Sequence, residues 1–227
     1  MPVPRGSLKE NEEMTESVQA LSGDTSLHLR EFDAPPADPV ALLRDWMAGA
    51  LRRGVREPYA AVLATVGPDG LPSTRVLLVK DLDARGLVFT SFKGSRKGRD
   101  LEARPGASMT FYWRETLQQI TVSGTVEELT AEESDALFAQ RPLAARVTSA
   151  VSRQSRPLDD ETALRERARE LAESGGPVQR PAEWTGYRLV PQAIEFWYGS
   201  PDRLHRRLAY ERTAQDAQAW THGRLQP

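Results

Sequence analysis

The stretch of sequence that decides the fold runs Ala60-Ala61-Val62-Leu63-Ala64-Thr65-Val66, then Gly67-Pro68-Asp69-Gly70, then Ser73-Thr74-Arg75-Val76-Leu77-Leu78-Val79-Lys80. Both longer runs are rich in β-branched and apolar residues with a period of two, which is typical of β-strands. The four residues between them are turn formers. The stretch therefore predicts a β-hairpin, in which Arg75 and Lys80, five residues apart, point to opposite faces.

More strand-like segments follow the hairpin at short spacing. Further strands are expected over 87–91, 107–114, 117–128, 186–190 and 193–197. Many short strands with few helices between them favour a closed sheet, because closure removes exposed strand edges. We therefore expect a barrel, in a fold class that is mostly β with peripheral helices (α+β).

Helices are expected at three places outside these strands. Asp38 is a suitable N-cap, and apolar residues recur at helical spacing over 39–53. Thr130 and Glu133 form a capping-box pattern, which opens a short helix. Residues 159–173 place Glu and Arg four apart, which predicts a solvated surface helix.

Composition limits the class of protein. The chain has 227 residues, of which 39% are hydrophobic, so we expect one domain over 26–227 behind a disordered polar tail over 1–25. With no cysteine and no run of about 18 apolar residues, a cytoplasmic protein without thiolate chemistry is expected. A formal charge of −2 argues against nucleic-acid and membrane partners. Three widely spaced histidines argue against a metal site.

Candidate ligand-binding residues lie at strand ends. Thr90-Ser91 ends one strand, and Gly94-Ser95-Arg96-Lys97 follows at the expected start of a helix. Free backbone N–H groups, hydroxyls and two cations there suit a phosphate. In the alternative interpretation, Ser95 only caps the helix and the two cations are solvated. Rossmann, P-loop, zincin and nucleophile-elbow motifs are absent from the chain.

Two amide-containing pairs and several aromatic residues are less specific signals. Gln118-Gln119 and Gln154-Ser155 carry groups that could recognise a heterocycle with several donors and acceptors. Tyr112, Trp113 and Trp197 are by default core aromatics, since such side chains bury large areas. Each signal taken alone leaves the function open.

Five blocks, in this order, carry a specific family resemblance. They are Ser73 to Lys80, Gly94-Ser95-Arg96-Lys97, Val151-Ser152-Arg153-Gln154-Ser155, Ile194-Glu195-Phe196-Trp197 and Asp202-Arg203-Leu204-His205-Arg206-Arg207. Over roughly residues 30–227 the chain resembles the pyridoxamine 5'-phosphate oxidase superfamily. The resemblance implies a split β-barrel homodimer, with FMN in a cleft formed by both subunits.

The resemblance also implies roles for individual residues. The implied cofactor-binding residues are Arg75, Val76, Leu77, Leu78, Lys80, Thr90, Ser91, Arg96, Lys97, Gln119, Gln154, Ser155, Trp197 and Arg207. The implied substrate-binding residues are Lys80, Arg141, Arg203 and His205. No side chain is assigned as catalytic, because N5 of the flavin takes the hydride. His205 is expected to serve in binding or proton handling.

Departures from the vitamin B6 enzymes indicate a different substrate. Those enzymes have a tyrosine ahead of the Arg141-Pro142 pair and a serine four residues after that arginine, and both help hold the substrate phosphate. Leu137 and Ala145 stand at these positions here. Together with residues 112–119 and the ending Arg224-Leu225-Gln226-Pro227, they make the chain look more like the phenazine-biosynthesis flavin oxidases.

The expected function is an FMN-dependent oxidase that aromatises reduced phenazine precursors, such as dihydro- or tetrahydrophenazine carboxylates. Electrons would pass to O2 and give H2O2, and the substrate would be a small aromatic or heterocyclic acid. One alternative is a pyridoxamine or pyridoxine 5'-phosphate oxidase of vitamin B6 metabolism. Another is a flavin or heme-derivative binding protein without turnover, because a fold does not determine a function.

Overall fold

The computed structural model of the chain describes residues 22–213 and 219–227. The strands are β1 (Ala60–Val66), β2 (Pro72–Leu78), β3 (Asp81–Leu82), β4 (Leu87–Phe92), β5 (Gly106–Trp113), β6 (Gln118–Glu128), β7 (Trp184–Tyr198), β8 (Arg206–Arg212) and β9 (Trp220–Leu225). The helices are η1 (Arg30–Phe32), α2 (Pro39–Arg52), α3 (Arg96–Ala103), η2 (Arg114–Thr116), α4 (Ala131–Ala139), α5 (Leu143–Val151) and α6 (Glu161–Glu173). No helix among the described residues is long and apolar enough to cross a membrane.

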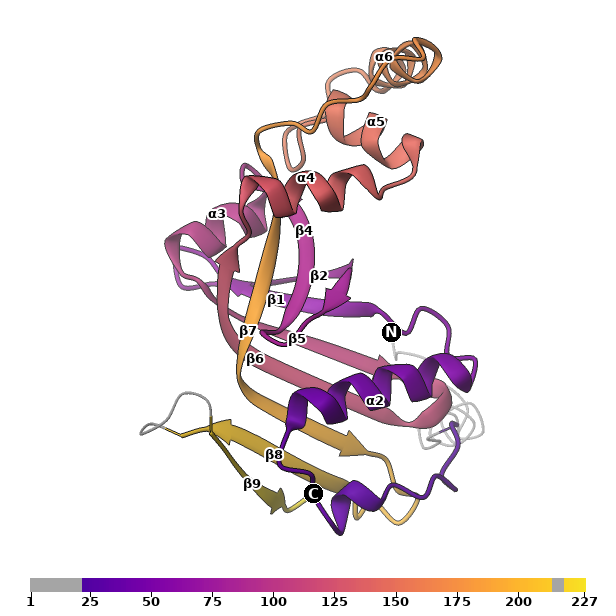
Figure 1. Cartoon of the computed structure of the whole chain (residues 1–227), viewed down its shortest axis with the longest axis vertical. Helices are drawn as coiled ribbons and strands as arrows, with labels where there is room; N and C mark the ends of the chain where they lie inside the picture. The colour runs from indigo at the N-terminus through magenta and orange to yellow at the C-terminus, as the bar shows by residue number, and fades with distance from the viewer. Residues whose placement is uncertain (1–21, 214–218) are drawn as a thin grey trace, which may run out of the picture.

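The nine strands form one antiparallel sheet that curls into a split β-barrel (Figure 1). The strand order is β2-β1-β5-β6-β7-β4-β3. In addition, β8 pairs with β7, and β9 pairs with β8. The predicted hairpin is confirmed, since β1 and β2 pair from Ala60 opposite Leu78 to Val66 opposite Pro72. The expectation of a mostly β fold with peripheral helices is likewise confirmed.

The long strand β7 corrects the two strands expected at 186–190 and 193–197. It runs without a break from Trp184 to Tyr198, and the ladder to β6 shifts register between Ser123 and Gly124. Pro191, which has no N–H to donate, lies opposite Gly124 at this bulge. A Cβ on Gly124 would lie 2.0 Å from the Val190 carbonyl oxygen, so only glycine fits there.

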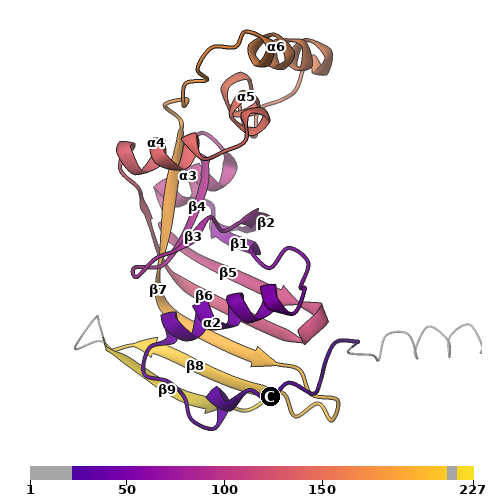
Figure 2. The same cartoon turned by 45° about the vertical axis from the view of Figure 1, so that its right-hand side comes forward.

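Helix α2 covers one face of the sheet and closes the main core (Figure 2). Asp38 is its N-cap, as predicted, and accepts hydrogen bonds from the N–H groups of Val40 and Ala41. The Trp46 ring lies 5.1 Å from the Phe196 ring, edge to face. Apolar burial on this scale is the dominant source of stability for the barrel.

The opposite face of the sheet exposes large apolar side chains. Val62 of β1 pairs with Val76 of β2, and Val76 is 69% exposed. Leu78 and Tyr112 are also exposed. A contiguous apolar surface on a sheet is a common sign of association with another surface.

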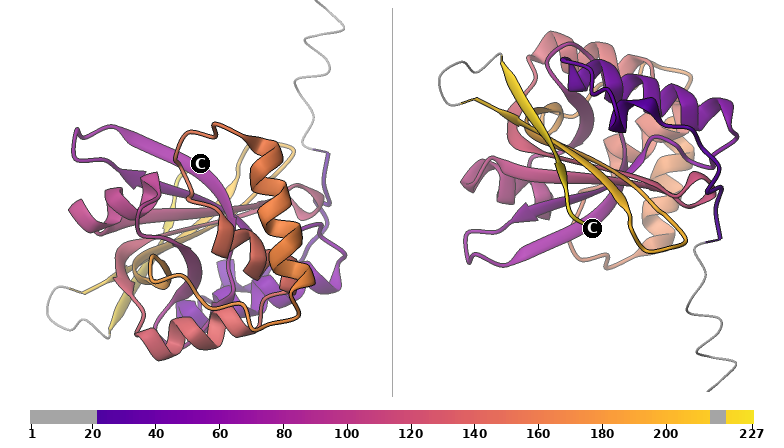
Figure 3. Two further views of the ribbon diagram at one scale, coloured as in Figure 1. Left: turned by 90° about the horizontal axis from the view of Figure 1, so that it is seen from above. Right: turned by 90° about the horizontal axis from the view of Figure 1, so that it is seen from below.

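Helices α4, α5 and α6 project beyond the end of the sheet, and Figure 3 shows α5 and α6 lying across that end from above. A second apolar cluster, formed by Phe138, Val147, Val178 and Trp184, joins them to the barrel. Thr130 and Glu133 form the predicted capping box of α4. No residue of α6 is buried, as expected for a solvated helix.

We expect disorder over residues 1–25, and residues 1–21 of that segment lie outside the described residues. The remainder of that segment contacts the barrel. The Asp24 N–H donates to the Glu115 carbonyl at 2.8 Å, and the Tyr198 hydroxyl donates to the Asp24 carbonyl at 3.2 Å.

Candidate functional site

A cationic corner forms where β2 meets the start of α3. Arg75 donates from Nη1 to the Thr65 hydroxyl and from Nη2 to the Ser73 hydroxyl, both at 2.7 Å. Both hydroxyls in turn donate to Oδ2 of Asp100, which is buried. Asp100 therefore holds Arg75 in place through these two hydroxyls. The direct distance from Oδ2 of Asp100 to Nη2 of Arg75 is 3.8 Å.

Lys97 completes this corner. Its Nζ donates to the Ser91 hydroxyl at 3.1 Å and to Oε1 of Gln154 at 3.3 Å. Burial lowers the pKa of Lys97, and the charge of Arg75 lowers it further. Burial also lowers the pKa of Arg75; the charge of Asp100 partly offsets this effect, and that of nearby Arg96 adds to it. Three cations with one carboxylate leave an excess of positive charge, which a bound anion would relieve.

The N-terminus of α3 opens into the same corner. Ser95 is the N-cap and accepts from the Gly98 N–H at 3.2 Å, so its capping role is confirmed. The Arg96 N–H donates to the Ser155 hydroxyl at 3.2 Å. Ser155 has a φ of 68°, which a serine rarely adopts and which places its hydroxyl over the helix end. The first turn of α3 thus adds donors to those of Arg75 and Lys97.

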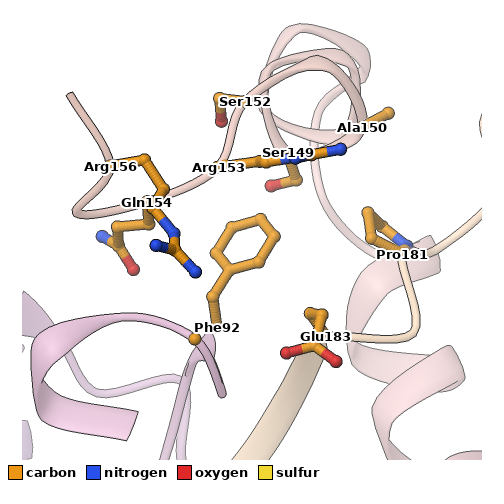
Figure 4. A pocket seen from close by; sticks show the side chains of 10 residues that line it. Phe92, Ser149, Ala150, Ser152, Arg153, Gln154, Arg156, Pro181 and Glu183 are labelled. Atoms are coloured by element: carbon orange, nitrogen blue, oxygen red, sulfur yellow. The ribbon is translucent and has the colours of Figure 1, made fainter. Parts of the chain in front are cut away.

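A pocket of about 340 Å³ adjoins the corner through Gln154. Figure 4 shows the Phe92 ring at its centre, with Gln154 and Arg156 on one side and Glu183 on the other. The end of α5, including Ser149, forms another wall. The pocket thus offers an aromatic ring together with guanidinium groups and one carboxylate.

A second group of predicted residues lies on the exposed side of β6, β7 and β8. Gln119 pairs with Trp197, and Trp197 pairs with Arg207. Arg207 is held in a two-point ion pair, from Nε to Oε1 of Glu195 at 2.7 Å and from Nη2 to Oε2 at 3.0 Å. Its Nη1 donates to the Gln226 carbonyl at 3.1 Å. This arrangement fixes a flat, partly exposed row of an amide, an indole and a guanidinium.

His205 extends this second group from a tight turn. The Ser200 N–H donates to Nδ1 of His205 at 3.0 Å, and the imidazole lies 4.8 Å from the Trp197 ring. Asp202 accepts from the Ser200 hydroxyl and from the Leu204 N–H, and Arg203 has a φ of 66°. Because Nδ1 is an acceptor, the neutral imidazole carries its proton on Nε2 and presents a donor.

The two groups lie at opposite ends of β7. Ser91 pairs with Thr185, whereas Trp197 lies twelve residues further along the same strand. At about 3.3 Å per residue, this is a path of up to about 40 Å along the strand. One chain therefore does not bring its two groups of predicted residues to one small ligand.

The remaining predicted residues are placed as follows. Lys80 lies beyond the end of β2, so the strand alternation expected between Arg75 and Lys80 does not extend to it. Its side chain is exposed beside α2, in a groove with Arg44 and Tyr59. Val76 and Leu78 are on the exposed face, Leu77 packs against the core, and Thr90 is partly buried beside Ser91.

Arg141 lies between α4 and α5, over the Trp184 ring at 5.1 Å, and it donates to Ser149, which lines the same pocket as Gln154. Sequence reasoning assigned no role to four supporting residues, because each acts through a predicted residue: Thr65, Asp100, Ser149 and Glu195.

Comparison with known proteins identifies the family. A family model described as pyridoxamine 5'-phosphate oxidase matches residues 47–175. A second model, the pyridoxine 5'-phosphate oxidase C-terminal dimerisation region, matches residues 184–227, which include the whole second group except Gln119. The dimerisation match agrees with the expected homodimer.

Relatives of two kinds are similar to this chain. A dihydrophenazinedicarboxylate synthase from Pseudomonas chlororaphis is 42% identical over 209 residues, covering 92% of this chain and 93% of that protein. A pyridoxine/pyridoxamine 5'-phosphate oxidase from Burkholderia cenocepacia is 46% identical over 200 residues, covering 88% and 93%.

Two solved structures share the fold. PhzG from Burkholderia lata, in complex with tetrahydrophenazine-1-carboxylic acid, has a TM-score of 0.87 and 44% identity, covering 90% of this chain and all of that one. An FMN-binding protein from Nostoc punctiforme has a TM-score of 0.66 at 21% identity, covering 81% and 97%. The chain therefore belongs to the pyridoxamine 5'-phosphate oxidase family, and its similarity extends to the phenazine-biosynthesis branch.

Proposed function

We propose that this protein is an FMN-dependent oxidase that aromatises reduced phenazine carboxylates. The cationic corner carries the proposal. The charge of Arg75 acts on Lys97 and that of Arg96 on Arg75, and Asp100 is the carboxylate beside Arg75 among the described residues. Arg75 and Lys97 both have lowered pKa values. Such a corner suits a phosphate group, and the hydroxyl of Ser91 adds a further polar contact.

The rest of the flavin would be held across a homodimer. Gln119, Trp197 and Arg207 form a flat polar and aromatic row, which suits one edge and one face of an isoalloxazine ring. That row lies far from the same chain's Lys97, and most of it lies in the matched dimerisation region. In a symmetric dimer each cationic corner can meet the partner's row, with the exposed apolar face between them.

The proposed substrate class follows from the surroundings of Arg141. Relatives of both kinds have similar identity, so identity does not choose between a phenazine and a vitamin B6 phosphate. Leu137 and Ala145, which flank Arg141 in sequence, offer no hydroxyl to a phosphate. A missing hydrogen bond to a charged group costs roughly 1.5–3 kcal/mol. This favours a substrate whose anion needs fewer donors, as a carboxylate does.

The chain's own groups would bind and orient the substrate. When bound, FMN supplies the hydride acceptor, and O2 takes up the two electrons with release of H2O2. His205 would donate from Nε2 to the substrate, and the Trp197 ring beside it would limit its position. No side chain is required as a strong base, because aromatisation of the substrate supplies the driving force.

Anaerobic mixing of the flavin-loaded protein with a dihydrophenazine carboxylate tests the proposal. We expect loss of the oxidised flavin absorbance, followed by its return and by H2O2 when air is admitted. Rapid bleaching by pyridoxine 5'-phosphate, with none by the phenazine, would assign the chain to vitamin B6 metabolism. A bound flavin that neither compound reduces would indicate a binding protein without turnover.

A further inference from the structure

Arg141 is a partly buried cation without a carboxylate partner among the described residues. Its guanidinium lies over the Phe138 ring at 5.7 Å and over the Trp184 ring at 5.1 Å. Burial lowers the pKa of Arg141, and no neighbouring acidic group offsets that effect. Removing a cation from water costs free energy, and a neighbouring anion offsets that cost.

One hydrogen bond fixes the orientation of this guanidinium. Nη1 of Arg141 donates to the hydroxyl of Ser149 at 2.6 Å. Ser149 is buried on α5, and its hydroxyl donates its own proton to the Ala145 carbonyl at 3.0 Å. The hydroxyl therefore serves Arg141 as an acceptor and has no proton left for a ligand.

We propose that Ser149 is a positioning residue, which with Phe138 and Trp184 turns the Nε–Nη2 edge of Arg141 toward the carboxylate of the substrate. Within the described part of the chain, Nε and Nη2 of Arg141 have no hydrogen-bond partner. This edge carries two parallel N–H donors, which match the two oxygens of a carboxylate. The inference rests on the proposed function and adds the residue that selects the anion.

The same geometry discriminates against a phosphate. A phosphate monoester presents three oxygens, and the two donors of the free edge leave at least one of them without a partner here. Ser149 cannot supply the missing proton, because the Ala145 carbonyl already takes it. Leu137 is apolar and packs against the cluster of Phe138 and Trp184. The free edge of Arg141 therefore matches a planar carboxylate better than a phosphate.

The test compares anion recognition in flavin-loaded variants. The probes are phenazine-1-carboxylate, unsubstituted phenazine and pyridoxal 5'-phosphate, titrated against the flavin absorbance. Ser149→Ala removes the acceptor of Arg141, and Ser149→Thr keeps it. Thr148→Ala is the matched control, because the Thr148 hydroxyl makes the same kind of bond, to the Ala144 carbonyl at 2.9 Å, on the exposed side of α5.

We expect Ser149→Ala to weaken binding of phenazine-1-carboxylate about three- to tenfold. Arg141→Met should weaken it by more. Binding of unsubstituted phenazine and the flavin content should not change, and Ser149→Thr should recover most of the affinity. An unchanged affinity for the carboxylate in Arg141→Met, or an equal loss for the uncharged phenazine, would overturn the inference.

Flavin reduction separates failure of this inference from failure of the proposed function. If dihydrophenazine and its 1-carboxylate reduce the wild-type flavin with equal apparent affinity, the oxidase function stands and the role of Ser149 and Arg141 is wrong. If neither reduces it, the proposed function fails and the inference fails with it. A higher apparent Kd for the carboxylate in Ser149→Ala, at an unchanged limiting rate of reduction, supports both.

Discussion

At residue scale, Lys97 and Arg75 are neighbouring cations whose repulsion a bound anion would offset. The pKa of Lys97 is lowered from its ordinary value of 10.5 by burial and by the charge of Arg75. In the free protein the charged form of Lys97 is therefore disfavoured. A bound phosphate favours that charged form, so binding must raise the pKa again.

The first prediction concerns the pH dependence of flavin affinity. Between neutral pH and the lowered pKa of Lys97 the ammonium is already present, and FMN affinity should be constant. As pH rises through that pKa, which lies below 10.5, binding must also recharge Lys97, and affinity should fall. Equilibrium titration of apoprotein with FMN between neutral and alkaline pH measures this fall.

Two variants isolate the contribution of Lys97. Lys97→Arg keeps its charge at all these pH values, so the part of the fall that Lys97 causes should disappear. Lys97→Met should weaken binding about tenfold to a hundredfold at neutral pH. Lys93→Met is the control, since Lys93 pairs with Glu128 and not with the corner. A fall with pH that persists unchanged in Lys97→Arg would contradict the assignment.

The second prediction concerns the donor on His205. Because Nδ1 accepts from the Ser200 N–H, the useful donor is Nε2. Glutamine can place an amide N–H near the position of Nε2, whereas asparagine reaches only the position of Nδ1. We therefore expect His205→Gln to keep more of the wild-type kcat/KM than His205→Asn, with unchanged flavin content. The reverse order would show that Nδ1 faces the substrate.

Sequence reasoning found the candidate ligand-binding residues more readily than the residues that hold them in place. Arg75, Lys97 and Gln154 stand in recognisable blocks, and the structure brings them together. Asp100 and Ser149 lie in no such block and act through a neighbour. The predicted residues through which they act lie eight or more positions away along the chain, so only the folded geometry reveals the contacts.

At the scale of elements, α2 is the helix that stabilises the main core. Its Trp46 is buried against Phe196, and its indole Nε1 donates to Glu31. The third prediction is that Trp46→Ala lowers the free energy of unfolding by about 3–5 kcal/mol, through the lost burial and the cavity left behind. Urea unfolding followed by circular dichroism measures the loss.

A second position on α2 provides the matched control. Leu51 is 56% exposed on the same helix, and Leu51→Ala should change the free energy of unfolding by less than about 0.5 kcal/mol. Similar losses in both variants would contradict packing of Trp46 on the sheet as the source of this stability, since alanine raises the helix propensity at both positions.

Elements with a local signal were predictable, and elements that depend on tertiary pairing were not. The caps Asp38 and Thr130 and the alternation of β1 and β2 are local, and all are confirmed. By contrast, the two strands expected at 186–190 and 193–197 form the single strand β7, which stays continuous because the ladder to β6 shifts register opposite Pro191. The edge strand β9 was also missed, because its residues are mostly exposed and gain order only by pairing with β8.

At the scale of the whole molecule, one chain does not bring its two groups of candidate site residues together. We call the cationic corner the first half-site, and the group of Gln119, Trp197, Arg207 and His205 the second. Lys97 and Arg75 lie near the start of β7, and Trp197 and Arg207 lie near its end. The sequence blocks gave the members of both half-sites. Their separation depends on the length and continuity of β7, which the sequence did not predict. We expect a homodimer to resolve this separation, because each chain could then complete the site of the other.

The fourth prediction is that two inactive variants restore each other when mixed. Lys97→Met damages the first half-site and Trp197→Ala the second, and each variant alone should retain little flavin and turnover. In a mixed dimer, one site combines the altered corner of the first chain with the altered row of the second, so it carries both changes. The other site combines the two unaltered halves and stays intact. After co-expression with different tags, random pairing should recover about a quarter of the wild-type flavin sites, since half of the dimers are mixed and each has one good site.

Purification of the mixed dimer through both tags sharpens this test. Its flavin content should rise to about one site per dimer, at the wild-type affinity for that site. If each chain instead built its site alone, every site would carry one of the two changes, and mixing would restore nothing. Recovery thus requires that Lys97 of one chain and Trp197 of the other contact the same flavin, which the length of β7 prevents within a single chain.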